Sequence, residues 1–145
     1  MPELRPIVLV EDDANDVELT MLALAEHNLA NPVVVLRDGV AALDFLYSRG
    51  EYAAQDRPNP VVMLLDLKMP KLNGLDVLKQ IKSDDRLKLM PVVMLTSSRE
   101  ERDLVASYQL GVNAYVVKPV SFQEFVSAIR GLGIFWALIN EPPPN

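Results

Sequence analysis

The chain has 145 residues, half of them hydrophobic, and this length and composition predict one globular domain with its own core. Its net charge of −6 argues against a nucleic-acid partner, and the absence of cysteine excludes disulfides, cysteine-ligated zinc and thiol catalysis. No apolar run approaches the ~20 residues of a membrane span and no signal peptide is visible, so we expect a cytoplasmic protein without membrane contact.

Short apolar runs alternate along the chain with segments of helical periodicity. The β-branched runs predict strands at residues 7–10, 33–36, 61–65, 92–95 and 114–117. Helices are predicted after each strand, with the fourth at residues 99–109. Their expected caps are Asp13, Asp38 and the capping box of Ser121 with Glu124. The first helix is expected to turn Val17, Met21, Leu24 and Ala25 inward.

This alternation predicts an α/β fold in which a five-stranded parallel sheet carries helices on both faces. A single domain is expected over residues 1–145, with a C-terminal helix extension and a proline-rich tail from about residue 131. Residues 47–60 are polar and are expected to form a long loop or a helix extension. In such sheets, ligands bind beyond the carboxyl ends of the strands.

Four of the predicted strands run directly into residues that handle phosphate or metal: Glu11 with Asp12, Asp66, Thr96 and Lys118. Each residue taken alone could have a purely structural role, as a turn residue, a helix cap or a surface lysine. Three carboxylates brought together repel each other, which requires a raised pKa or a cation, and oxygen ligands of this kind suit magnesium. An aspartate can attack phosphorus, and a lysine beside a metal neutralises the transferred charge. The set therefore predicts phosphoryl transfer to a carboxylate.

These residues, in this order, resemble a response regulator receiver domain of a two-component system over essentially the whole chain. The matching motifs are Val10-Glu11-Asp12, Leu65 to Pro70 with Gly74, Thr96-Ser97, Tyr115 and Lys118-Pro119. The resemblance implies the flavodoxin-like (βα)5 receiver fold and a protein that is not an enzyme, although it promotes its own aspartyl phosphorylation and slow dephosphorylation. It also implies that a sensor histidine kinase phosphorylates Asp66.

The resemblance further implies a role for each matching residue of the site. Asp12, Asp66 and the backbone carbonyl of Lys68 would hold Mg²⁺, with Glu11 assisting through water, and Mn²⁺ or Ca²⁺ could substitute. Thr96 and Tyr115 would be the switch residues, and Lys118 would pair with the phosphate.

A narrower resemblance points to the single-domain regulators that are paired with phytochrome sensor histidine kinases. It is carried by the stretches at residues 44–52, the loop to Pro60, and residues 135–143. No DNA-binding or catalytic output segment is visible, so the expected output is a surface change read by an unidentified downstream protein.

Two further expectations concern kinetics and assembly. Lys68 and Ser98 stand two residues past Asp66 and Thr96, where they would border the path of an attacking water, and this predicts slow loss of phosphate. An apolar patch on the C-terminal helix, which a single core cannot easily cover, predicts a homodimer. Its residues are Ile134, Phe135, Leu138 and Ile139. The alternative is that the helix end folds back, because Gly131 and Gly133 allow a bend.

Other functions remain open at this point. A phosphatase with an aspartate nucleophile would use a second aspartate two residues on, where Lys68 stands. A nucleotide or flavin module would need a glycine-rich loop in place of the acids after the first strand. A receiver could also be a scaffold that is not phosphorylated, a phosphate sink or a phosphorelay intermediate.

Overall fold

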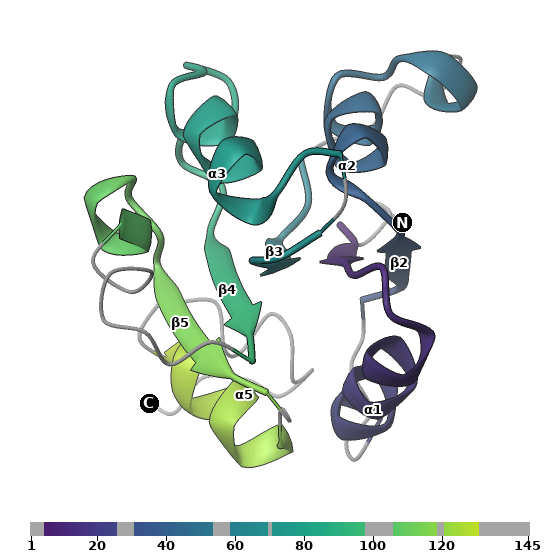
Figure 1. Cartoon of the computed structure of the whole chain (residues 1–145), viewed down its shortest axis with the longest axis vertical. Helices are drawn as coiled ribbons and strands as arrows, with labels where there is room; N and C mark the ends of the chain where they lie inside the picture. Colours follow the sequence, from purple (N-terminus) through teal and green to yellow (C-terminus); the bar gives the residue numbers. More distant parts are fainter. Residues whose placement is uncertain are drawn as a thin grey trace, which may run out of the picture.

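The computed structural model describes residues 5–25, 31–53, 59–69, 71–97, 106–118 and 121–130, without the side chains of Thr96, Phe122 and Ile129. Five parallel strands form one sheet in the order β2-β1-β3-β4-β5 (Figure 1). They are β1 (Ile7–Val10), β2 (Val33–Leu36), β3 (Val62–Asp66), β4 (Val92–Thr96) and β5 (Ala114–Val117). The predicted α/β fold with a five-stranded parallel sheet is confirmed, and its strand order is the flavodoxin-like one.

Helices cover both faces of the sheet. They are α1 (Ala14–Leu24), α2 (Gly39–Leu46), α3 (Gly74–Lys82) and α5 (Phe122–Arg130), with a 3₁₀ turn η1 (Gly50–Tyr52). Residues 106–109 are also helical. In Figure 1, α2 and α3 lie on one side of the sheet and α1 and α5 on the other. None of the helices described here is long and apolar enough to cross a bilayer.

Two apolar layers explain why the strands are continuous hydrophobic runs. In β1, Val8 and Val10 pack into the layer beneath α2 and α3, whereas Ile7 and Leu9 pack into the layer beneath α1 and α5. All four side chains are fully buried. Burial of one such side chain stabilises the fold by about 1.5–3 kcal/mol, so an apolar residue is favoured at every strand position, on both faces.

Helix caps fix where α1, α2 and α5 begin. The predicted caps Asp13, Asp38 and Ser121 each accept the backbone N–H three residues on, at 3.0, 2.7 and 3.1 Å. The structure adds a fourth cap of the same kind, Asn73, which accepts a backbone N–H of α3 at 3.0 Å. These caps set the first turn of each helix close above the carboxyl edge of the sheet.

Several boundaries differ from the prediction. Strand β3 includes Asp66 and β4 includes Thr96, because their backbones pair with Leu95 and Val117 in the parallel ladder. Ala25 was wrongly placed on the inward stripe of α1. It is exposed because the helix ends at Leu24. The start of the predicted fourth helix lies outside the described residues, as do Ser98 and Pro119. The same holds for the residues of the expected dimer patch, which are Ile134, Phe135, Leu138 and Ile139.

Candidate functional site

The carboxyl edge of the sheet gathers the three acids that the sequence singled out. Strands β1 and β3 are neighbours and pair Val10 with Leu65, so the residues that follow, Glu11 and Asp66, meet side by side. Carboxylate oxygens of Glu11, Asp12 and Asp66 all lie within 4.8 Å of one another. Glu11 and Asp66 are buried, while Asp12 is exposed at the mouth of the cluster.

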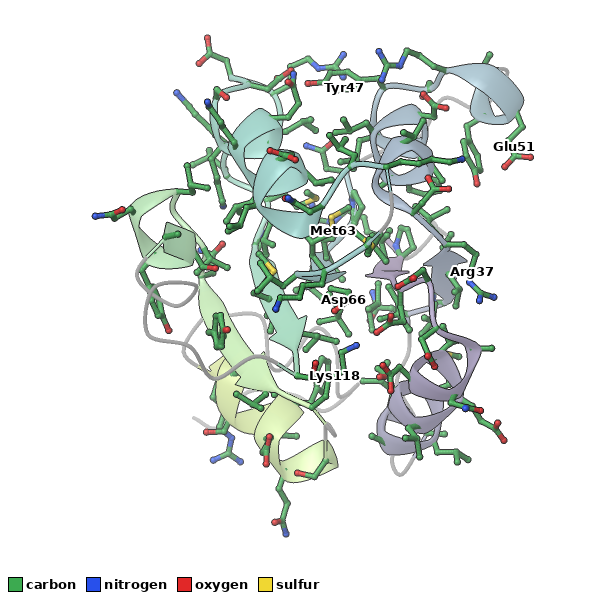
Figure 2. All side chains as sticks on the ribbon, in the orientation of Figure 1. Arg37, Tyr47, Glu51, Met63, Asp66 and Lys118 are labelled. Atoms are coloured by element: carbon green, nitrogen blue, oxygen red, sulfur yellow. The ribbon has the colours of Figure 1, made fainter. Side chains whose placement is uncertain are left out.

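Lys118 reaches this cluster from the end of β5, across the end of β4. Its Nζ lies 3.2 Å from Asp66 Oδ1 and 2.8 Å from Asp16 Oδ2, and it also donates a hydrogen bond to Glu11 Oε1. Figure 2 places Asp66 and Lys118 next to each other at the centre of the molecule. The lysine side chain is only 11% exposed, so the ammonium is held among carboxylates rather than solvated.

The surroundings of Asp66 and Lys118 raise the pKa values of both side chains. Burial raises the pKa of Asp66 to about 7, the negative charge of Glu11 adds to the rise, and the ammonium of Lys118 opposes it. Burial by itself lowers the pKa of Lys118, but hydrogen bonds to Asp16 and Glu11 and the charge of Asp66 raise that pKa overall. The lysine therefore stays charged, yet one ammonium does not offset all the nearby acids.

A divalent cation fits the remaining negative charge. The pKa of Asp66 is raised mainly by burial and then by the negative charge of Glu11, and the three clustered carboxylate oxygens are the hard ligands that magnesium prefers. Asp12, being exposed, leaves room on that side for water ligands. Glu11, Asp12 and Asp66 are the residues that would hold the ion, and a role for the Lys68 carbonyl stays a prediction.

Glycines let the loop after Asp66 pack tightly. Gly74 donates its N–H to Leu67 O at 2.7 Å, and a Cβ at this position would lie 2.3 Å from Asp66 O. A Cβ on Gly39 would similarly lie 2.4 Å from Leu72 O. Helices α2 and α3 therefore clamp the loop at two points, which fixes the backbone that carries Asp66.

Two residues of the site were missed by sequence reasoning. Asp16 lies in the first turn of α1, and its carboxylate accepts a hydrogen bond from Lys118, a contact that the sequence did not predict. Arg37, labelled in Figure 2, follows β2. Its Nη2 donates a hydrogen bond to Asp12 O at 2.8 Å, which ties down the β1–α1 loop. The position of Arg37 directly after a strand was the available signal, because polar residues there share one edge.

The two expected switch residues lie on the neighbouring strands β4 and β5, where Tyr115 pairs with Met94 and Thr96 pairs with Val117. Thr96 is the last residue of β4, and Tyr115 lies in β5, half-buried against the apolar layer of α2 and α3. A hollow of about 510 Å³ is lined by Tyr115 together with residues of β5, α5 and the 106–109 segment, among them Tyr108 and Glu124. Tyr115 thus has space beside it at the edge of the sheet.

Comparison with known proteins gives a consistent result. A family model for the response regulator receiver domain matches residues 7–130. The response regulator Rcp1 of Synechocystis sp. is 42% identical over 132 residues, which are 91% of this chain and 88% of Rcp1. The probable methanogenesis regulatory protein FilR2 of Methanothrix harundinacea is 38% identical over 137 residues, covering 94% of this chain and 86% of its own.

Solved structures of similar sequence share the fold. The bacteriophytochrome response regulator AtBRR is 61% identical with a TM-score of 0.87, over 97% of this chain and 100% of that chain. The Mn²⁺-bound form of Rcp1 and the phosphorylated cyanobacterial phytochrome response regulator RcpA are each 39% identical with a TM-score of 0.76. Both comparisons cover 97% of this chain and 99% of the other.

Proposed function

Since the chain belongs to the response regulator receiver family, we propose that it accepts a phosphoryl group on Asp66 from a sensor histidine kinase of the phytochrome type. One observation carries this proposal: the buried carboxylate of Asp66 lies at the end of the central strand, within 3.2 Å of the Lys118 ammonium and beside two further acids. The arrangement combines a nucleophile with charge neutralisation, which is most of what phosphoryl transfer requires.

In the proposed reaction, a carboxylate oxygen of Asp66 attacks the phosphorus of a phosphohistidine. The P–N bond breaks, and its electron pair stays on the imidazole nitrogen, which takes a proton from solvent. The phosphoryl group adds about 1.5–2 negative charges, and the Lys118 ammonium, already 3.2 Å from Asp66, is placed to pair with it. A magnesium ion held by Asp12, Asp66 and Glu11 would supply further neutralisation of that charge.

The phytochrome pairing is supported by the similarity of the chain to phytochrome response regulators. AtBRR is a bacteriophytochrome response regulator and RcpA a cyanobacterial phytochrome response regulator. We expect phosphotransfer from a purified phytochrome-type histidine kinase to be at least about tenfold faster than transfer from an unrelated histidine kinase. Transfer of labelled phosphate over time measures both rates, and equal rates would contradict the pairing while leaving Asp66 as the acceptor.

We propose that a downstream protein recognises the phosphorylated state by a change in the surface of this chain. The added charge at the strand edge would draw Thr96 toward it, and Tyr115 would repack inward, which shifts the population between two packings. The half-burial of Tyr115 beside a hollow supports this motion. A cytoplasmic location is proposed with it, because the phosphate donor is a sensor histidine kinase.

The homodimer remains a proposal that rests on the sequence pattern. Its expected residues, Ile134, Phe135, Leu138 and Ile139, follow the last described helix and lie outside the described residues. The apolar spacing after residue 131 supports a partner surface there.

Phosphate loss is expected to be slow because of Lys68. Its side chain is exposed, two residues past Asp66, where it can cover the phosphoryl group or take the place of the attacking water. Lys68→Asn should speed dephosphorylation about tenfold, which corresponds to roughly 1.4 kcal/mol of barrier. The decay of labelled protein after removal of the donor measures this rate.

Lys71→Asn is the matched control. Lys71 belongs to the same loop and has a φ of 68°, which asparagine adopts readily, so the substitution changes the charge without straining the backbone. Its decay rate should match that of the wild type. An unchanged or slower decay in Lys68→Asn would refute the role of that lysine.

A further inference from the structure

The ammonium of Lys118 is shared among three acids, and one of them has no role in the proposed phosphotransfer. Glu11 and Asp66 belong to the acid cluster, but Asp16 comes from the first turn of α1 and is not among the clustered metal-binding acids. Its Oδ2 nevertheless lies 2.8 Å from Lys118 Nζ, closer than Asp66 Oδ1 at 3.2 Å. The lysine is therefore drawn toward α1 as well as toward the acceptor.

Solvent access separates Asp16 from the other two acids. The side chain of Asp16 is 34% exposed, against 2% for Glu11 and 7% for Asp66. Water can replace the lysine around the carboxylate of Asp16, whereas the loss of an ion-pair partner is costly for a buried carboxylate. Asp16 is thus the acid that Lys118 can leave most easily.

We propose that Asp16 competes with the phosphoryl group for Lys118 and so weakens the phosphorylated state. This inference rests on the proposed function, in which Asp66 carries the phosphoryl group. An ammonium has three N–H donors, and here three carboxylates surround it. A phosphoryl group on Asp66 brings three new acceptor oxygens, and Lys118 turns toward them at the expense of its bond to Asp16.

A simpler role for Asp16 makes a different prediction. An acid in the first turn stabilises a helix through the positive end of the helix dipole, and it would act in this way without any contact to Lys118. Replacement of Asp16 would then lower the stability of the fold and leave binding of a phosphoryl group unchanged. The competition proposed here requires a change in binding that depends on Lys118.

The experiment measures the affinity for beryllofluoride, a stable mimic of the phosphoryl group, by calorimetry in the presence of Mg²⁺. Asp16→Asn should bind it about threefold more tightly than the wild type, the range expected for losing one partly exposed ion pair. Asp16→Ser should give at least the same gain, because serine carries no charge and is too short to keep even the hydrogen bond to Lys118 that an asparagine oxygen could accept. Glu18→Gln, an equal charge change at an exposed position of α1, should leave the affinity unchanged.

A double-mutant cycle with Lys118→Gln decides whether the effect passes through the lysine. In that background, Asp16→Asn should produce no gain. The same gain there would mean that Asp16 acts only as a general negative charge, and unchanged or weaker binding in both Asp16 variants would equally overturn the proposal. If wild-type protein binds no beryllofluoride at all, the proposed function itself fails. If it binds and the Asp16 variants do not gain, only the competition fails.

Discussion

Asp66→Asn is expected to abolish the uptake of phosphate from a small phosphodonor in the presence of magnesium. A carboxamide is a far weaker nucleophile than a carboxylate, and the substitution keeps the size of the side chain at a buried position. Incorporation of labelled phosphate into the purified protein measures the effect. Asp44→Asn, at a partly exposed aspartate of α2 that forms an ion pair with Arg49, is the matched control and should label like the wild type.

The metal dependence of the same reaction tests the acid cluster. Asp12→Asn removes one of the three carboxylates whose oxygens lie within 4.8 Å of one another. Magnesium should then bind more weakly, so labelling should require a higher magnesium concentration. Removal of magnesium by a chelator should suppress labelling of the wild type. Label that persists in Asp66→Asn would show that another residue accepts the phosphate, and the assignment of Asp66 would be wrong.

Without divalent metal, the protein is expected to lose stability as pH rises. The folded-state pKa of Asp66 is raised to about 7, mainly by burial and then by Glu11, from the value of 3.8 expected in the unfolded chain. Between these values, the folded state holds a proton that the unfolded state has released, so protonation favours folding. The contribution is fully present below the unfolded pKa and is lost as pH rises through the folded pKa.

Ionisation of Asp66 alone should lower the free energy of unfolding by about 2 kcal/mol between about pH 5 and about pH 7. Urea denaturation in chelator at the two pH values measures it. Lys118 does not contribute in this window, because its pKa is raised from 10.5 and it is charged in both states. Magnesium should restore stability at the higher pH, where the carboxylates are ionised and bind it.

Asp66→Asn provides the control for the pH dependence. Because the amide does not titrate, the variant should lose less stability than the wild type over the same interval, and it should be the more stable of the two at the higher pH in chelator. The same pH dependence in both proteins would mean that Asp66 ionises normally in the fold and that burial and Glu11 do not raise its pKa.

The sequence by itself determined the architecture and the sheet edge at which the acid cluster and Lys118 meet. Runs such as Ile7 to Val10 are apolar at every position, and this is favoured only where a strand is covered on both faces. In a parallel sheet, the carboxyl ends of all strands face the same way, so the polar residues that end β1, β3 and β5 had to share one edge. The predicted meeting of Glu11, Asp66 and Lys118 followed from that rule alone.

Only the tertiary structure decided which partners those residues bond. Lys118 and Asp16 are 102 positions apart, and their contact depends on how α1 crosses the sheet edge, which the helix pattern does not encode. The bond from Arg37 to the Asp12 carbonyl depends in the same way on the course of the β1–α1 loop. A local pattern fixes the kind of element and the face that is buried, whereas a polar contact between elements requires positions accurate to a fraction of an ångström, which the packing of the whole core sets.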